Sequence, residues 1–261
     1  MDLGISDKGA LVLAGTRGLG RAIADALAAE GAHVLVAGRT PDALAAVVEG
    51  IRAKGGRAES VVMDLGDPGA LAALDAALPS SIGQVDILVC NSGGPPPGRM
   101  IDADLDVMRS QFEMMAMRLI EIAHHYAPAM AERGWGRILT VGSSGVIQPI
   151  PTLGLSNAIR GVLAGWSKSL ANDLAGQGVT VNMLLPGRIH TERVDQLDGA
   201  AAERQGKTIE EIRAIQRAAI PAGRYGDPAE FAAVAAFLCS AQAAYVTGSQ
   251  IRCDGGQVRS L

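Results

Sequence analysis

The sequence predicts an α/β fold with one doubly wound parallel sheet of about seven strands and helices on both faces. Short apolar runs alternate with longer segments of helical period along the chain, an order typical of strand–helix–strand units. Of the 261 residues, 48% are hydrophobic but only 3% are aromatic. The core must therefore consist of Ala, Val, Leu, Ile and Met, the usual filling between helices and a parallel sheet. No linker rich in Ser or Pro divides the chain, so we expect a single domain spanning residues 1–261.

The strands are predicted at short apolar runs, because a sheet buried on both faces has apolar side chains at successive positions. In chain order they lie at 10–13, 33–37, 61–63, 85–90, 137–141, 180–185 and 250–253. Helices are predicted between them, where apolar residues recur every three or four positions. They lie at 21–29, 42–53, 67–78, 102–132, 152–175 and 227–239. The polar segment 188–222 interrupts this rhythm, and it is either a lid over the carboxyl edge of the sheet or a solvent-exposed helical excursion.

Charge and cysteine usage limit the classes of function. The formal net charge of −4 is spread along the chain without a run of like charges, so neither a nucleic acid nor a membrane is indicated as a partner. The first residues mix Asp2 and Asp7 with glycines, unlike a signal peptide or a spanning helix, and we expect a cytoplasmic protein. Cys90, Cys239 and Cys253 stand far apart among apolar neighbours, which indicates buried free thiols and no metal or redox site.

A glycine-rich turn is expected between the first strand and the first helix. Its Gly15, Gly18 and Gly20 would let the backbone approach a pyrophosphate, whose charge the amide groups at the helix N-terminus would meet. The second strand is followed by Arg39 and lacks the acidic residue that binds a ribose 2′-hydroxyl. Arg39 and Arg17 suit a 2′-phosphate, because a guanidinium binds phosphate through paired hydrogen bonds. We therefore expect NADP(H) to be favoured over NAD(H).

Further motifs follow in a definite order along the chain. They are Asp64-Leu65, Asn91-Ser92-Gly93, a loop from Pro186-Gly187 to Thr191, and a closing segment with Tyr245-Val246-Thr247-Gly248 and Asp254-Gly255-Gly256. With these motifs and the glycine-rich turn, residues 7–256 resemble the short-chain dehydrogenase/reductases, most closely their β-ketoacyl carrier-protein reductase-like branch. The resemblance implies a Rossmann fold and a dinucleotide cofactor. The residues implied in cofactor binding are Gly15, Thr16, Arg17, Gly18, Leu19, Gly20, Arg39, Asp64, Leu65, Asn91, Ser92, Gly93, Arg160, Pro186, Gly187, Ile189 and Thr191.

The resemblance also places the catalytic positions, and three of them depart from the family. The catalytic Ser falls on Ser143, whereas the YxxxK motif falls on Ser156 and Arg160 and the catalytic Asn on Met115. A serine hydroxyl is a far weaker acid than a phenol, whose pKa is about 10. Arg160 keeps a positive charge one helical turn from Ser156 and would orient the cofactor. Its pKa, above about 12, makes it a poor proton relay.

Two more residues bear on the expected site. Ala14 stands where the family has the first glycine of its turn, and Gly15 follows one place later. His190 lies in the loop after the strand at 180–185, and imidazole titrates near neutral pH. His190 is therefore either a proton donor in the reaction or an ordinary surface residue.

The resemblance implies an NADP(H)-dependent oxidoreductase that acts on a carbonyl or alcohol of a small molecule, in the manner of a 3-oxoacyl reductase. Ser143 would polarise the substrate oxygen, and Ser156 or a water would supply the proton. Two alternatives remain open: a catalytically impaired dinucleotide-binding sensor or partner subunit, and non-redox chemistry such as hydration or elimination in the same cleft. The resemblance also implies a homodimer or homotetramer through the helices at 102–132 and 152–175. The residues expected there are Ala116, Ile120, Leu163 and Ala164.

Overall fold

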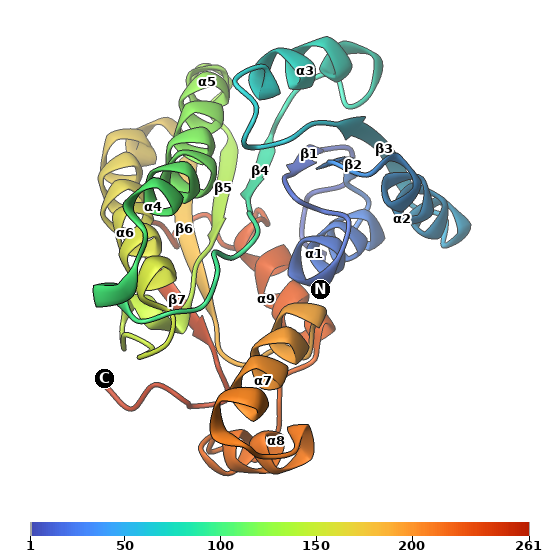
Figure 1. The fold of residues 1–261 in the computed structure, drawn as a ribbon. Helices are drawn as coiled ribbons and strands as arrows, with labels where there is room; N and C mark the ends of the chain where they lie inside the picture. The colour runs from blue at the N-terminus through green and yellow to red at the C-terminus, as the bar shows by residue number, and fades with distance from the viewer. Residues whose placement is uncertain (1, 261) are drawn as a thin grey trace.

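The computed structural model describes residues 2–260, and their strands form one seven-stranded sheet (Figure 1). The strands are β1 Gly9–Val12, β2 His33–Gly38, β3 Arg57–Val62, β4 Ile87–Cys90, β5 Gly136–Val141, β6 Val179–Pro186 and β7 Gln250–Cys253. Neighbouring strands are parallel throughout, in the order β3-β2-β1-β4-β5-β6-β7. The chain winds outward from β1 to β3, returns to β4 beside β1, and winds outward again to β7. This confirms the doubly wound parallel sheet predicted from the sequence.

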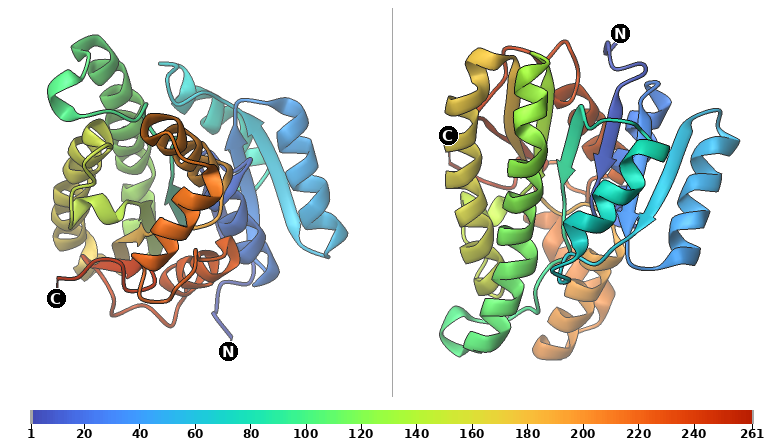
Figure 2. Two further views of the ribbon diagram at one scale, coloured as in Figure 1. Left: turned by 60° about the horizontal axis from the view of Figure 1, so that its bottom comes forward. Right: turned by 90° about the horizontal axis from the view of Figure 1, so that it is seen from above.

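Helices cover both faces of this sheet (Figures 1 and 2). They are α1 Gly18–Ala29, α2 Pro41–Ala53, α3 Ala70–Ala77, α4 Leu105–Phe112, α5 Arg118–Glu132, α6 Gly154–Leu174, α7 Glu192–Gln205, α8 Ile209–Ala218 and α9 Pro228–Leu238. Buried residues of α1, α2 and α9 pack against one face, and those of α3, α5 and α6 pack against the other. The pair α7 and α8 lies apart from both layers, at one end of the molecule (Figure 1, bottom).

The central strands are apolar because both of their faces are covered. Successive side chains of a strand point to opposite faces. In β1, Leu11 belongs to the core beneath α5 and α6, whereas Ala10 and Val12 belong to the core beneath α1 and α9. All three side chains are fully buried. The continuous apolar runs in the sequence follow from this double burial.

The edge strand β3 begins earlier than the strand predicted at 61–63. It pairs with β2 alone among the described strands, and only two of its six residues are buried. Ala58 and Val61 are buried, whereas Arg57 and Ser60 are exposed. An edge strand with so few buried residues has no continuous apolar run, and the apolar pattern therefore misses its first half.

The long helix predicted at 102–132 is divided in three. α4 ends at Phe112, the turn Glu113–Met117 is π-helical, and α5 begins at Arg118. A π-helical turn widens the helix by one residue without leaving helical dihedrals, so the sequence period hardly reveals it. The buried side chains of Met115 and Ala116 lie in this turn.

The segment 188–222 forms two helices, α7 and α8, and a buried carboxylate of α7 bonds to residues on either side of this helix pair. Asp198 of α7 has no exposed surface. Its Oδ1 accepts a hydrogen bond from Arg188, and its Oδ2 accepts one from the Tyr225 hydroxyl at 2.9 Å. Arg188 precedes the two helices in the chain and Tyr225 follows them, so the hydrogen bonds of Asp198 join α7 to the chain at both ends of the helix pair.

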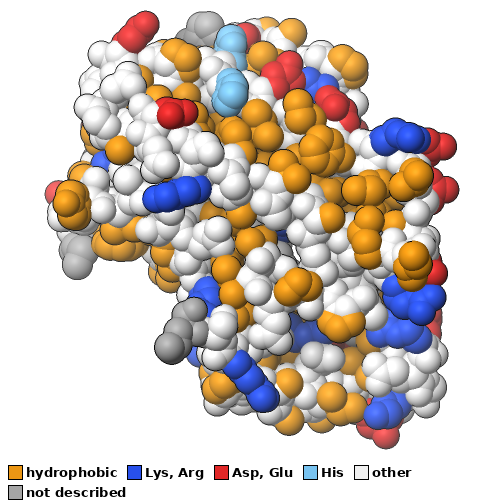
Figure 3. Space-filling model, turned by 90° about the vertical axis from the view of Figure 1, so that its left-hand side faces the viewer, with side chains coloured by type: hydrophobic (Ala, Val, Ile, Leu, Met, Phe, Trp, Pro, Cys, Tyr) orange, Lys and Arg blue, Asp and Glu red, His pale blue; other side chains and the backbone are white. Residues whose placement is uncertain are grey.

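The residues expected at a subunit interface lie in the core of the subunit. Ala116 and Leu163 have no exposed surface, and Ala164 is only 9% exposed, while Ile120 packs against the same core. Their helical spacing arises because they face the sheet, so the fully buried Ala116 and Leu163 are not available to a second subunit. The placement of Ile120 and Ala164 at an interface stays a prediction. The apolar side chains that α6 and the π-helical turn expose are others, among them Val162 and Met117 at 42% each. Figure 3 shows hydrophobic side chains gathered on this side of the molecule.

The remaining expectations from composition concern cysteines and membranes. Cys90 and Cys239 are buried free thiols, and burial raises the pKa of each to about 12. Cys253 is also free but partly exposed, because it ends the edge strand β7; the expectation of burial is wrong there. Within residues 2–260, the helices are all too short or too polar to cross a membrane.

Candidate functional site

The site is built at the carboxyl edge of the sheet, where the strand order reverses between β1 and β4. Asn91 directly follows β4, and its Nδ2 donates hydrogen bonds to the carbonyl oxygens of Leu13 and Ala14, both at 3.2 Å. These bonds fix the turn after β1 against the end of β4. A crevice at such a switch point is where doubly wound sheets bind ligands.

The glycine-rich turn needs a residue without a Cβ at Gly20. A Cβ there would lie 2.5 Å from the Ala14 carbonyl oxygen and 2.7 Å from Asn91 Nδ2, where no atom fits. Ala14 itself holds φ +48, a left-handed conformation that glycine adopts without steric cost. The turn is therefore closely packed at Gly20 and left-handed at Ala14.

The two arginines expected to favour a 2′-phosphate have different partners. Arg39 follows β2, and its NH1 lies 3.7 Å from Asp64 Oδ2, which follows β3. Arg17 of the glycine-rich turn pairs with Glu192 of α7, NH1 to Oε2 at 3.0 Å. Both arginine side chains are about two-thirds exposed, at 68% and 67%, so both guanidinium groups are accessible to a ligand.

Ser143 lies beyond the end of β5 and caps the short 3-10 turn Ser144–Val146. Its Oγ accepts a hydrogen bond from the Gly145 amide at 3.0 Å. Asn157 of α6 fixes the loop that follows, because it donates to the Ile150 carbonyl at 2.9 Å and accepts from the Ile150 amide at 3.2 Å. Asn157 thus sets the loop of Ser143 against the first turn of α6. Sequence analysis did not single out Asn157.

Ser156 and Arg160 lie on the buried side of α6, 8% and 7% exposed. Arg160 NH1 donates to the carbonyl oxygen of Val141, the last residue of β5. Among residues 2–260, no carboxylate lies within 4.0 Å of this guanidinium. Burial and, to a smaller extent, the charge of Arg193 lower the pKa of Arg160 to about 10. This pKa is below the value above 12 expected from the sequence.

Arg193 joins the site from α7. Its NH2 donates to the Pro95 carbonyl oxygen at 2.6 Å, and its guanidinium covers Gly94, where a Cβ would be 3.0 Å from Nε. Burial lowers its pKa. The end of the loop 94–98 is hydrogen-bonded to the start of α6. The Gly98 amide donates to the Thr152 carbonyl at 2.8 Å, and the Gly98 carbonyl accepts from the Gly154 amide at 3.0 Å. This loop therefore connects the position of Arg193 with the start of the helix that carries Arg160.

Comparison with known proteins identifies the family. The sequence profile of the family described as enoyl-(acyl carrier protein) reductase matches residues 13–257. The chain belongs to the short-chain dehydrogenase/reductase family. It is 32% identical over 249 residues to the 3-oxoacyl-[acyl-carrier-protein] reductase FabG of Escherichia coli, covering 95% of this chain and 96% of FabG.

Solved structures of the family share the whole fold. The L-sorbose reductase of Gluconobacter frateurii, in complex with NADPH and L-sorbose, superimposes with a TM-score of 0.93 at 30% identity and covers 100% of both chains. YwfH, an NADPH-dependent reductase involved in bacilysin biosynthesis, has a TM-score of 0.92 at 28% identity, covering 97% of this chain and 99% of YwfH. Short-chain dehydrogenase/reductases are NAD(P)-dependent oxidoreductases, and this chain has their complete architecture.

Two of the three tyrosines of the chain have a carboxylate as the partner of their hydroxyl group. Tyr126 donates its hydroxyl to Asp75 and Tyr225 to Asp198, both at 2.9 Å. Burial is the largest cause that raises the pKa of each, to about 12 for Tyr225. A raised pKa makes a phenol a weaker acid. Tyr245 is fully exposed.

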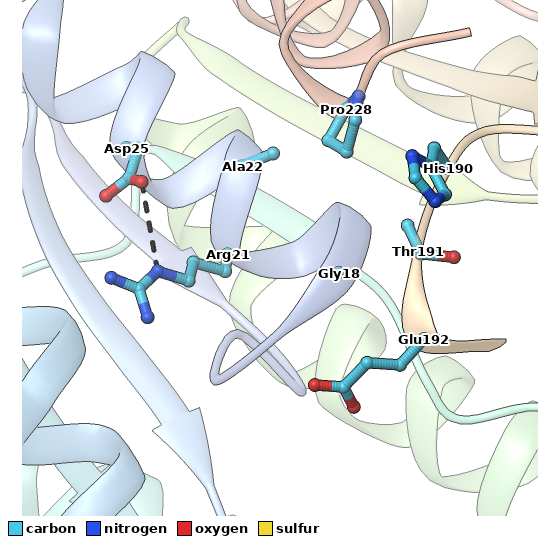
Figure 4. Close-up of a pocket in the computed structure, with 8 residues that line it drawn as sticks. All are labelled: Gly18, Arg21, Ala22, Asp25, His190, Thr191, Glu192 and Pro228. Atoms are coloured by element: carbon cyan, nitrogen blue, oxygen red, sulfur yellow. Dashed lines mark ion pairs between the residues drawn. The ribbon is translucent and has the colours of Figure 1, made fainter. Parts of the chain in front are cut away.

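His190 lies in a shallow pocket beside α1 and α9, whose lining includes neither Ser143 nor Ser156 (Figure 4). The residues that line it are Gly18, Arg21, Ala22, Asp25, His190, Thr191, Glu192 and Pro228. The imidazole is 64% exposed, with Nε2 3.6 Å from Asp195 Oδ1. This placement fits the surface residue better than the proton donor. Among residues 2–260, no group of three or more His, Cys, Asp or Glu side chains is placed to hold a metal ion.

Proposed function

We propose that this chain is an NADP(H)-dependent reductase of small carbonyl compounds, of the 3-oxoacyl reductase type in its overall architecture. The observation that carries the proposal is the junction of the glycine-rich turn, Asn91 and the β5 end at one edge of the sheet. The space that a Cβ at Gly20 would fill and the amide groups at the start of α1 fit a pyrophosphate. The relatives named above are reductases, which favours redox turnover over a sensor, a partner subunit or a hydration reaction.

The cofactor would supply a hydride, and the chain's own residues would bind and orient it. The residues that would hold it are those of the turn (Gly15, Thr16, Arg17, Gly18, Leu19, Gly20), Arg39, Asp64, Leu65, Asn91, Ser92, Gly93, Arg160, Pro186, Gly187, Ile189 and Thr191. Arg39 and Arg17 favour the phosphorylated cofactor, because exposed guanidinium groups bind phosphate through paired hydrogen bonds.

The reaction would use two serines and an arginine. Ser143 Oγ already accepts a hydrogen bond from Gly145, so its proton is directed elsewhere and would donate to the substrate oxygen. Arg160 remains protonated at neutral pH, since its pKa is about 10, and it would stabilise negative charge that develops on that oxygen. Ser156, or a water held beside it, would deliver the proton in place of the family's tyrosine.

Spectrophotometry tests the proposal. NADPH and NADH are titrated into the protein, and absorbance is followed with a panel of ketones and 3-oxoacyl thioesters. Cofactor binding with turnover supports the reductase. Binding without turnover of the panel would favour the sensor or partner subunit, and failure to bind either nucleotide would leave non-redox chemistry.

We also propose a lid and a homo-oligomer. The segment 188–222 would act as the lid, because α7 contacts both sides of the crevice, through Glu192 with Arg17 and through Arg193 with Pro95. The homodimer or homotetramer would use the outward side of α4 to α6 (Figure 3).

A further inference from the structure

We propose that Arg118 is a positioning residue of the cofactor site, which holds the loop after β3 in place for the adenosine half of NADP(H). This role deepens the proposed function and rests on it. Arg118 is the first residue of α5, and its side chain forms a hydrogen bond that leaves its own helix. No motif in the sequence points to it.

Two acids neutralise the Arg118 charge along its own helical stretch. Its NH1 donates to Glu121, and its NH2 lies 3.7 Å from Glu113 across the π-helical turn. Both glutamates are about half exposed, whereas Arg118 is 5% exposed. Such pairs form at the surface elsewhere in the chain, for example between the exposed Arg109 and Asp106 of α4. The two glutamates therefore account for the charge of Arg118 but not for its burial.

The third partner of Arg118 accounts for its burial. Its Nε donates to the carbonyl oxygen of Leu65 at 3.2 Å, a bond between residues 53 positions apart. Leu65 follows β3 and is itself buried. Within residues 2–260, Arg118 is the only donor to this oxygen. A buried carbonyl group needs a donor, and the guanidinium reaches inward to supply it.

The Leu65–Gly66 peptide unit is held from both sides. Arg118 binds its carbonyl oxygen, and the Gly66 amide donates to Asp64 Oδ1 at 2.9 Å. The other oxygen of that carboxylate, Oδ2, lies 3.7 Å from Arg39 NH1. A peptide unit that turned would lose both hydrogen bonds and release the carboxylate. Through one peptide unit, Arg118 therefore fixes the Asp64 side chain, which in turn pairs with Arg39.

This loop lies at the end of the crevice where the adenosine half would bind. β2 and β3 end side by side, because Gly38 pairs with Val62 and its carbonyl oxygen accepts from the Met63 amide at 2.8 Å. In a doubly wound sheet the ribose of the dinucleotide lies near the end of the second strand. Arg39 stands there and would pair with the 2′-phosphate. A loop that moved would therefore weaken the binding of the phosphorylated adenosine half.

The same helix provides a matched control at its other end. Arg133 follows the last residue of α5, and its NH2 donates to the Val85 carbonyl oxygen at 2.7 Å and lies 3.3 Å from Asp86 Oδ1. Like Arg118, it thus combines an acid with a backbone carbonyl group. Val85 and Asp86 precede β4, at the edge of the sheet opposite the crevice. A change at Arg133 therefore disturbs a comparable contact far from the cofactor.

Calorimetric titration of two ligands tests the role. NADPH and 2′,5′-ADP, which is the phosphorylated adenosine half alone, are titrated into wild type, Arg118→Gln and Arg133→Gln. We expect Arg118→Gln to weaken both ligands about 3- to 10-fold, the range for one ordinary hydrogen bond. Arg133→Gln should keep the wild-type affinity, although urea unfolding should show that both variants lose stability. Arg118→Lys should recover part of the affinity, and Arg118→Met, which keeps an apolar stem in the buried space, repeats the test if the glutamine variant does not fold.

The outcomes separate this role from turnover. Weaker 2′,5′-ADP binding in Arg118→Gln but not in Arg133→Gln supports the role, even if no carbonyl compound is reduced and the proposed function fails. Wild-type affinity in a folded Arg118→Gln or Arg118→Met would overturn the role and leave the reductase intact. An equal loss of affinity in Arg118→Gln and Arg133→Gln would also overturn it, because affinity would then follow stability. A wild type that binds neither ligand would overturn both the role and the proposed function.

Discussion

The turn after β1 places an alanine, Ala14, in a left-handed backbone conformation. Asn91 holds Ala14 in its left-handed conformation, with φ +48, because its Nδ2 donates to the carbonyl oxygens on both sides of the Ala14 α-carbon, those of Leu13 and Ala14. The geometry comes from contacts distant in sequence and persists against the local preference of alanine.

Ala14→Gly should therefore stabilise the protein. Relief of the left-handed conformation gains about 1–2 kcal/mol, and the more flexible unfolded chain offsets about 0.4–1 kcal/mol of it. We expect the free energy of unfolding in urea to rise by about 0.5–1 kcal/mol. Ala46→Gly, in the exposed interior of α2, is the matched control and should lower it by about 0.5–1 kcal/mol. A fall of similar size in both variants would contradict this account.

Cofactor preference should depend on Arg39. The exposed guanidinium beside Asp64 would pair with a 2′-phosphate and gain nothing from a 2′-hydroxyl. We expect NADPH to bind more tightly than NADH by fluorescence titration, and Arg39→Ala to reduce the difference. Arg109→Ala, an exposed arginine of α4, should preserve it. Equal affinities for both nucleotides in the wild type would exclude the role of Arg39.

The proposed role of Ser156 can be tested by building the YxxxK motif at positions 156 and 160. Ser156→Tyr with Arg160→Lys should raise the rate of NADPH oxidation by up to about 10²–10⁴, the contribution of a positioned general acid. Each single change should do less, because the phenol needs the neighbouring amine to lower its pKa. Cofactor affinity and circular dichroism control for folding, since position 156 is buried. No gain in a folded double variant that binds NADPH would show that the pocket serves a different chemistry.

At the scale of elements, burial decides what the sequence reveals. β1 is covered on both faces and reads as a continuous apolar run, whereas β3 lies at the edge and reads as polar in its first half. The π-helical turn Glu113–Met117 keeps the helical period of apolar residues, so the sequence pattern does not reveal it. Arg193 could not be predicted either, because its contact with Pro95 joins residues far apart in sequence and neither carries a family motif.

The attachment of α7 and α8 should depend on Asp198. Removing this buried charge leaves Arg188, only 21% exposed, without its carboxylate, and breaking such a pair costs about 3–5 kcal/mol. We expect Asp198→Asn to lower the free energy of unfolding by about 3 kcal/mol and to speed amide exchange in 192–218. Asp195→Asn removes a half-exposed acid from the same helix and should cost at most about 1 kcal/mol. Equal effects would mean that burial of Asp198 does not hold the segment.

At the scale of the whole molecule, the strand order follows from general rules. Right-handed crossovers and a glycine-rich first turn predict a sheet that winds both ways from β1, and this is what the chain forms. Surfaces are less predictable, because apolar residues at helical spacing indicate a buried side without saying what buries it. Leu163 and Ala164 are covered by the subunit's own sheet, and Val162, next to them, is not.

The oligomer should accordingly depend on the exposed apolar residues. Val162 and Met117 are each 42% exposed on the side of α4 to α6, and Leu105 is 61% exposed. We expect sedimentation at micromolar concentration to show a dimer or tetramer, and Val162→Asp with Met117→Asp to shift it toward the monomer, because two charges would be desolvated at the contact. Ile209→Asp on α8, equally exposed at 47% and outside that side, should leave the assembly unchanged. A monomeric wild type would refute the oligomer, and an assembly that persists in the double variant would place the contact elsewhere on the surface.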